Sequence, residues 1–216
     1  FIFPENRLTN ETLIKFNKLL IYFGSFLIDI GLMKRKSYVI MSVLLVVSLL
    51  MFSPLGTTAK FYLTKFLAAS PRVLSASERY KIESYDWRLK DPDWQFFSLA
   101  QSQGKPVFVH FWASWHLPSK ATLDGVQAFY DQYKDRIDFY VVTNEERAPV
   151  EAFMSLNQYS FPVTYRVVGE STPFKDISLG ASYLLSSKGE VLIETNQASN
   201  WNDKTLFVQI DSCLKE

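Results

Sequence analysis

The chain has 216 residues, 48% of them hydrophobic, and a formal net charge of +1 at pH 7. This length suits one globular domain plus an additional segment, and the balanced charge gives no support for nucleic acid or another strongly charged partner. The single cysteine, Cys213, excludes an intramolecular disulfide and a metal cluster built from the cysteines of one chain.

An apolar segment without charged side chains covers residues 37–59 and follows the basic run "MKRK" at 33–36. It is long enough to cross a bilayer core, which takes about 20 residues, and the basic run should stay on the cytoplasmic side. We therefore predict a signal anchor at 33–59 that crosses the inner (cytoplasmic) membrane once and leaves the C-terminal domain in the periplasm. Two alternatives stay open, namely a buried core helix and a signal peptide cleaved near the small residues at 57–59.

The segments on either side of the predicted anchor carry weaker patterns. Residues 1–32 form an uncertain N-terminal extension, because the chain opens without a methionine and Met33 has the setting of a true start. The apolar run at 19–28 is alternatively a short membrane-associated element. Residues 60–84 are expected to form a juxtamembrane helix and a polar linker, and the helix has four apolar side chains on one face: Tyr62, Leu63, Phe66 and Leu67. The alternative is that this helix continues the anchor helix as a stalk.

Strand and helix patterns alternate over residues 85–216. Apolar runs of strand length lie at 107–111, 137–142, 182–185 and 191–194. A helix is expected between the first two strands, although Gly125 weakens it by about 1 kcal/mol, and others should begin at Pro149 and after Asn202 as N-cap. The first two strands should be parallel, and the last two should form a hairpin. This order predicts an α/β fold with a mixed central sheet flanked by helices.

Several segments of this region together resemble a known family. They are "GKPVFVHFWASW" (104–115), "FYVVTNEE" (139–146), "FPVTY" (161–165), "LGASYLLSSKGEVL" (179–192) and "ASNWN" (198–202). In this order they resemble the TlpA/ResA-type membrane-anchored thioredoxin-like proteins, also called redoxins. The resemblance implies a thioredoxin-like sandwich outside the cytoplasm and thiol–disulfide exchange through a Cys-x-x-Cys pair at the start of the first long helix.

The sequence departs from this family at the positions that carry the chemistry. His-Leu-Pro-Ser replaces Cys-x-x-Cys, so that His116 and Ser119 stand where the cysteines are expected and neither can form a disulfide. Gly180 stands where the family has a cis-proline opposite the cysteines, and a cis bond without proline would cost about 2.5–4 kcal/mol. His110 matches the strand position at which thioredoxins have a buried carboxylate, and we expect it to be a hydrogen-bonded core histidine.

Other chemistries at the turn have less support. His116 and Ser119 are close enough in sequence to suggest a serine nucleophile with its base, but the nearest acid, Asp124, lies more than one helical turn further along. A metal site through His110 and His116 would need further ligands, and none has a recognisable spacing. We expect His116 to be neutral at pH 7 because it begins a helix. No cofactor and no catalytic residue are expected.

The function predicted from these residues is that of a tethered protein without dithiol chemistry. We expect a binding or assembly module in which Trp115, His116, Leu117 and Gly180 form the surface for an extracytoplasmic protein or peptide. The alternative is a thiol–disulfide oxidoreductase that acts through Cys213, which lies on the apolar face of the last helix and is expected to be buried and inert. A minor alternative is metal binding through His110 and His116.

Overall fold

A computed structural model describes residues 18 and 35–214. The chain divides into two compact units, 1–57 and 58–216, and each is described by itself. The first unit contains α2 (Arg35–Phe52) and the start of α3 (Pro54–Leu67). The extension predicted at 1–32 lies outside the described residues, apart from Lys18.

Two helices cover the apolar segment that was predicted to be one anchor. Pro54 begins α3, since proline fits the first turn of a helix, and the Ser53 hydroxyl accepts a hydrogen bond from the Gly56 amide at 3.1 Å. In the part of the chain that the structure describes, no helix is long and apolar enough to cross a membrane. The transmembrane helix predicted at 33–59 is therefore not confirmed.

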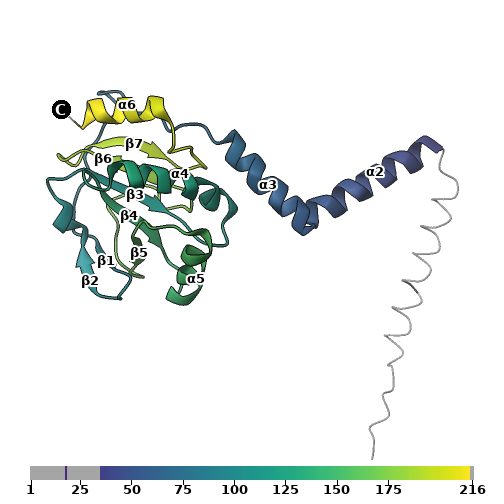
Figure 1. Ribbon diagram of the computed structural model, residues 1–216, viewed down its shortest axis with the longest axis horizontal. Coiled ribbons are helices and arrows are strands. Elements are labelled where there is room, and N and C mark those ends of the chain that lie inside the picture. The colour runs from purple at the N-terminus through teal and green to yellow at the C-terminus, as the bar shows by residue number, and fades with distance from the viewer. Residues whose placement is uncertain (1–17, 19–34, 215–216) are drawn as a thin grey trace, which may run out of the picture. The chain divides into compact units, whose positions relative to one another are not determined.

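The second unit is built around one mixed sheet (Figure 1). Its strands are β1 (Arg88–Lys90), β2 (Phe96–Ser98), β3 (Val107–Phe111), β4 (Asp138–Thr143), β5 (Val163–Arg166), β6 (Ser182–Leu185) and β7 (Val191–Thr195), in the spatial order β2-β1-β5-β4-β3-β6-β7. The three central strands β3, β4 and β5 are parallel, and the remaining pairs are antiparallel. The mixed sheet and the β6–β7 hairpin agree with the expectation from the sequence, whereas β1, β2 and β5 were not foreseen as strands.

Three α-helices alternate with or follow these strands: α4 (Leu117–Tyr133) after β3, α5 (Arg147–Asn157) after β4 and α6 (Lys204–Cys213) after β7. A short 3₁₀ helix spans Leu99–Ser102. The α5 helix starts at Arg147, two residues before the expected start at Pro149. The N-cap of α6 is Asp203 and not the expected Asn202, because the Asp203 carboxylate accepts hydrogen bonds from two amides of the first turn.

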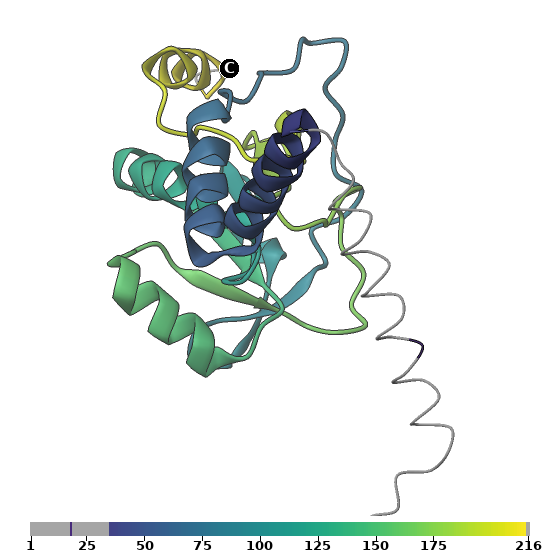
Figure 2. The same cartoon turned by 90° about the vertical axis from the view of Figure 1, so that its right-hand side faces the viewer.

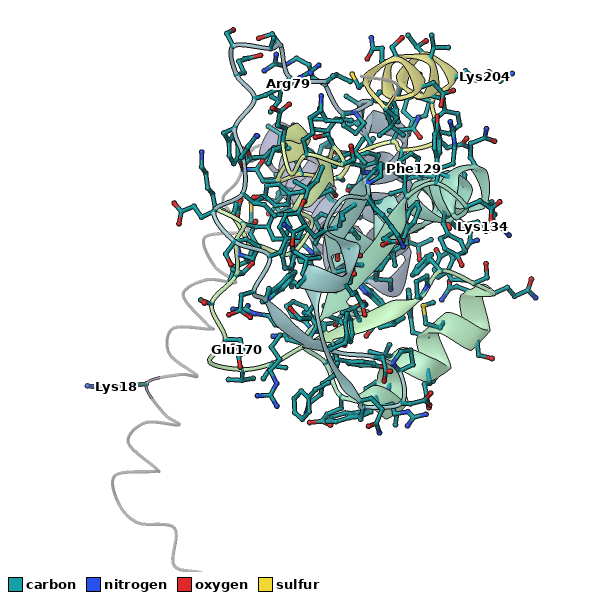
Figure 3. The ribbon with its side chains drawn as sticks, turned by 90° about the vertical axis from the view of Figure 1, so that its left-hand side faces the viewer. Lys18, Arg79, Phe129, Lys134, Glu170 and Lys204 are labelled. Atoms are coloured by element: carbon teal, nitrogen blue, oxygen red, sulfur yellow. The ribbon has the colours of Figure 1, made fainter. Side chains whose placement is uncertain are left out.

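Successive side chains of β3 point to opposite faces of the sheet and join two separate cores. On one face α4, α5 and α6 pack against the sheet, and the teal, green and yellow helices lie along the same side in Figure 2. Phe129 of α4, which is labelled in Figure 3, lies in this core with its ring centroid 5.2 Å from that of Phe108 and 5.3 Å from that of Trp201. The other face is covered by irregular segments around Trp87 and Phe174.

The α4 helix packs so closely on the loop before α6 that only glycine fits at one position. A Cβ atom on Gly125 would lie 2.9 Å from the backbone nitrogen of Trp201. The glycine that appeared only to weaken the helix therefore allows α4 to approach the chain that leads into α6.

The segment predicted as a polar linker pairs with the outer edge of β7. Isolated bridges join Val73 to Ile193 and Lys81 to Glu190, and the Leu74 amide donates to the Leu192 carbonyl at 2.8 Å. This segment belongs to the same compact unit as the sheet.

Candidate functional site

The candidate site is the turn that joins β3 to α4, at residues 112–119. Trp112 fixes its first part, because the Trp112 amide donates to the Val142 carbonyl at 2.9 Å and its indole nitrogen donates to the Val141 carbonyl at 3.3 Å. The indole ring is fully buried and packs on Phe153 of α5. The turn is thus attached to the end of the neighbouring parallel strand β4.

Hydrogen bonds between the two cysteine-position residues close the turn. The His116 Nδ1 lies 3.1 Å from the Ser119 hydroxyl and 3.4 Å from the Ser119 amide, so the His116 side chain caps α4. The Ser119 hydroxyl also lies 3.0 Å from the His116 carbonyl and 3.3 Å from the Ala113 amide. Ser119 is fully buried, so these two positions stabilise the helix start and hold no exposed nucleophile.

A carboxylate on the neighbouring strand end holds the outer part of the turn. Glu145 follows β4 and accepts hydrogen bonds from the Ser114 amide at 2.5 Å and from the Ser114 hydroxyl at 2.7 Å. Reasoning from the sequence missed this residue. The available signal was its place directly after a parallel strand, since the carboxyl ends of adjacent parallel strands meet at one edge of a sheet.

His110 lies beneath the turn as part of β3. Its Nδ1 is 2.8 Å from the Ser182 hydroxyl on β6, and among the described residues its Nε2 has no hydrogen-bond partner. Removal from solvent lowers the pKa of His110 to about 3, and nearby backbone of Ser119 and Ala181 acts in the opposite direction without overcoming it. His110 is therefore a neutral core histidine at physiological pH, as the sequence led us to expect.

Gly180 lies two residues before β6 and is hydrogen-bonded to the last residue of β3. Its φ is +101°, a conformation that favours glycine, and its amide donates to the Phe111 carbonyl at 2.7 Å. No cis peptide bond occurs among residues 35–214. At the position where the family has proline, this chain therefore has a buried glycine whose amide pairs with β3.

An open cleft of about 550 Å³ lies beside the turn. It is lined by the end of α3, the start of α4 and two loops: Thr64, Leu67, Ala68, His116, Pro118, Ser178, Leu179, Asn196, Gln197 and Ala198. The lining mixes apolar side chains with amide and hydroxyl groups and contains no Asp, Glu, Lys or Arg. Such a lining suits an uncharged segment of polypeptide better than a strongly charged ligand.

The four residues predicted to form the binding surface occupy different places around this cleft. His116 lines it, and Gly180 follows its wall residues Ser178 and Leu179. Trp115 is 69% exposed, and its ring lies edge-on to the His116 ring with centroids 5.8 Å apart. Leu117 is partly exposed, and neither it nor Trp115 is among the cleft residues.

The arrangement of polar groups gives no support for a serine nucleophile. Asp124 accepts a hydrogen bond from the Tyr159 hydroxyl at 2.5 Å and pairs with Lys65, so its carboxylate is engaged away from His116. Partial burial lowers the pKa of His116, which favours the neutral ring. His116, the base of this hypothesis, is thus neutral, but no acid orients its ring. The candidate nucleophile, Ser119, is buried.

The metal hypothesis also lacks ligands in the part of the chain that is described. Among these residues no group of three or more His, Cys, Asp or Glu side chains could hold a metal ion. In addition, His110 Nδ1 already bonds to Ser182.

Cys213 lies at the end of α6 and is partly exposed, so the expectation that it is buried is wrong. The Arg79 guanidinium is 3.5 Å from its Sγ, and together they border a small pocket of about 40 Å³ with Leu192 and Leu214. None of these residues lines the cleft beside His116. The only thiol of the chain is therefore placed apart from the turn.

Residues 83–170 match the sequence profile of the AhpC/TSA family. This part of the chain matches an AhpC/TSA-type redoxin domain. The profile covers β1 to β5 and therefore includes the turn with His116 and Ser119.

Curated proteins similar to this chain include thiol–disulfide oxidoreductases. Sporulation thiol-disulfide oxidoreductase A of Bacillus subtilis is 27% identical over 140 residues, which is 62% of this chain and 84% of that protein. Thiol-disulfide oxidoreductase ResA of Oceanobacillus iheyensis is 27% identical over 113 residues, which is 49% of this chain and 59% of the relative. The family resemblance of the sequence is confirmed, and with one cysteine the redoxin lacks a Cys-x-x-Cys motif.

Solved structures show the same fold at low identity. A DsbF homologue from Corynebacterium diphtheriae superposes with a TM-score of 0.54 at 15% identity, covering 66% of this chain and 92% of that one. A putative thiol:disulfide interchange protein DsbE from Chlorobium tepidum gives a TM-score of 0.53 at 21% identity, with 62% and 98% covered. The predicted thioredoxin-like fold of the C-terminal region is thus confirmed.

Proposed function

We propose that this redoxin is a membrane-tethered, extracytoplasmic protein that has lost dithiol chemistry and binds a protein or peptide segment in the cleft beside His116. One observation carries the proposal. The two positions of the redox pair are occupied by His116 and Ser119, whose side chains hydrogen-bond to each other and to the backbone of the turn. The shape of the turn is kept by these bonds, and a disulfide cannot form between them.

The surroundings of the turn support a binding role. The cleft is open and has amide and hydroxyl groups from Ser178, Asn196 and Gln197 beside the apolar side chains of Leu67 and Leu179. Backbone groups of an extended peptide can hydrogen-bond to such side chains while its apolar side chains contact the leucines. Trp115 adds an exposed ring next to the cleft residue His116.

The apolar N-terminal helix supports the tether. The described side chains of α2 include large apolar residues that are exposed around the helix: Val39, Ile40, Val43, Leu44, Leu45, Val46, Val47 and Leu49. A helix that is apolar on every side needs an apolar environment. The basic run at 33–36 would then lie on the cytoplasmic side and the redoxin domain outside.

Loss of dithiol chemistry is tested by disulfide reduction with the purified full chain. Insulin reduction should stay at the rate of the reductant alone, and Cys213→Ser should give the same rate as the parent chain. The double variant His116→Cys, Ser119→Cys provides the positive control, because it restores the spacing of the redox pair. Turnover by the parent chain above the Cys213→Ser variant would disprove the loss.

The competing function is disulfide exchange through Cys213. The names of the relatives and the guanidinium of Arg79 beside the thiol favour it. A lone thiol can attack a disulfide to form a mixed disulfide, but it needs a second thiol from another molecule to complete the exchange. Native Cys213 should react with iodoacetamide more slowly than after unfolding, and equally fast reaction in both states would favour the competing function.

Binding at the cleft is tested by site-specific crosslinking in the native membrane. A photoreactive amino acid is placed at Leu179 in the cleft wall, and the matched control is placed at Val208, which is exposed on α6. The proposal expects a discrete protein adduct from position 179 that is absent from position 208. Identical adduct patterns from the two positions, or no adduct from 179, would contradict it.

A further inference from the structure

The α3 helix has two faces of different character. Its outward face consists of Tyr62, Leu63, Phe66 and Leu67, whose exposed fractions are 62%, 57%, 86% and 67%. Side chains four residues apart lie on the same side of a helix, so these two i, i+4 pairs form one stripe. The stripe contains no charged residue, and we call it the α3 stripe.

The inward face of α3 is attached to the redoxin domain. Lys65 forms an ion pair with Asp124 of α4, and Asp124 also accepts the Tyr159 hydroxyl at 2.5 Å. Directly after the helix, the Asn200 amide donates to the Ala69 carbonyl at 3.0 Å. These contacts fix which side of the helix faces the domain and leave the α3 stripe uncovered.

The size of the α3 stripe argues against a protein partner. A stable protein interface buries about 800 Å² on each partner and involves about 20–30 residues a side. The stripe has four side chains on a single helix of 14 residues. It is therefore too small to serve as the core of such an interface.

A lipid surface fits the α3 stripe and its surroundings better. The helix follows α2 after the single residue Ser53, and α2 exposes apolar side chains on its described turns. An interfacial helix needs only an apolar stripe that enters the boundary between headgroups and acyl chains, and its opposite face can stay bound to protein. No span across the bilayer is required of α3.

We propose that the α3 stripe docks on a lipid surface and holds the redoxin domain against it. The proposal rests on the membrane tether of the proposed function and adds a second, peripheral contact. Leu67 belongs to the α3 stripe and also lines the cleft beside His116. The lipid surface therefore borders the cleft, and a polypeptide that enters the cleft does so next to the membrane.

The test measures the environment of single nitroxide labels on the full chain in vesicles of phosphatidylcholine with a minor fraction of phosphatidylglycerol. Because Cys213 is the only cysteine, the Cys213→Ser background permits one label at a time. Labels are placed through Phe66→Cys and Leu63→Cys in the stripe, through Thr64→Cys on the inward face, and through Val208→Cys on α6 as the control. Accessibility to oxygen is compared with accessibility to a water-soluble nickel chelate.

Labels at 63 and 66 should have an oxygen-to-nickel accessibility ratio several-fold above that at 208, with a lower ratio at 64. Adding Leu63→Glu should make the label at 66 as accessible to nickel as the label at 208, whereas adding Lys204→Glu should leave the label at 66 unchanged.

Two results would overturn the proposal in distinguishable ways. If the chain sediments with the vesicles while the label at 66 behaves like the one at 208, the tether is supported and the docking of α3 is contradicted. If the chain stays in the soluble fraction, both the tether and the docking are contradicted. Crosslinking from Leu179 reports on the cleft separately from either result.

Discussion

Two histidines mark the difference between the floor of the candidate site and its rim. The floor consists of His110 on β3 and Ser182 on β6, which are both fully buried and bonded to each other at 2.8 Å. The rim consists of Trp115 and His116, which lie on the turn and reach solvent. The two histidines are six positions apart, but one is fixed inside the sheet and the other caps a helix at the border of an open cleft.

This difference shows which part of the site is available for function. Polar groups of the floor are enclosed, and their contribution is to the stability of the sheet beneath the turn. Groups of the rim are accessible but contain no thiol and no charged catalytic pair. This contrast is in line with the proposed binding role, in which the accessible rim is the surface offered to a partner.

The largest effect is expected from a pair of tryptophan variants that separates the enclosed part of the turn from the rim. Trp112→Ala should destabilise the domain by about 3–5 kcal/mol, because it removes a buried ring and its hydrogen bond to Val141. Trp115→Ala should change stability by less than about 0.5 kcal/mol, since the ring is mostly exposed. Denaturant unfolding measures both, and similar losses for the two variants would contradict the distinction.

A second prediction concerns how the free energy of unfolding depends on pH through His110. His110 has a pKa of about 3 when folded and an ordinary value of 6.5 when unfolded, so the unfolded chain binds one more proton between these values. The stability that depends on neutral His110 is complete above pH 6.5 and is lost as the pH falls toward 3, at about 1.4 kcal/mol per pH unit. Lowering the pH from 6.5 to 4.5 should therefore cost roughly 2–3 kcal/mol through this residue.

The measurement compares urea unfolding of the parent chain, His110→Gln and His116→Gln over this pH range. The loss attributed to His110 should be absent from His110→Gln. It should remain largely intact in His116→Gln, because that side chain is only partly buried. Equal pH slopes for the parent chain and His110→Gln would show that the floor histidine does not carry this dependence.

A smaller effect is expected from the close contact that positions α4, the helix that carries the rim. Gly125→Ala should destabilise the domain by about 1–3 kcal/mol, because the new Cβ would meet the Trp201 backbone at 2.9 Å. In an open helix the same change would stabilise by up to about 1 kcal/mol. Thermal unfolding decides the sign, and a stabilised variant would mean that the contact with Trp201 relaxes easily.

The smallest predicted loss concerns Ser119, which links rim to floor. Ser119→Ala should cost about 1–2 kcal/mol, because it removes the hydroxyl bonded to the His116 ring and carbonyl and leaves a buried amide at Ala113 without this acceptor. Ser187→Ala in the exposed β6–β7 turn serves as control and should be neutral within about 0.5 kcal/mol. A neutral Ser119→Ala variant would show that the cap is dispensable.

The sequence predicted the centre of the fold better than its edge. The runs at 107–111 and 182–185 became β3 and β6 with the same bounds, because apolar runs of four or five residues between turn residues have the length of a strand and are too short for a typical helix. The three-residue strands β1 and β2 were missed, because they are too short to show a period. In the folded domain β1 pairs with β5 and with β2, and the Arg88 guanidinium lies 3.9 Å from the centre of the Phe96 ring.

Within the site, local spacing predicted some contacts and missed others. The contact between His116 and Ser119 could be predicted, because the two residues are three positions apart at the start of a helix. The clamp from Glu145 to Ser114 joins residues 31 positions apart and depends on β4 lying beside β3. The cleft could not be foreseen either, because Leu67 and Leu179 come from distant segments that meet only in the folded domain.

The pairing of residues 73–82 with β7 has a consequence for any shortened form of this protein. A strand at the edge of a sheet with unpaired amides and carbonyls is a template for association with other chains. A fragment that began at Tyr85, where the strand and helix pattern starts, would uncover Ile193 and its neighbours and invite aggregation. A soluble fragment should therefore retain the chain from Ala69 onward, so that β7 keeps its protective cover.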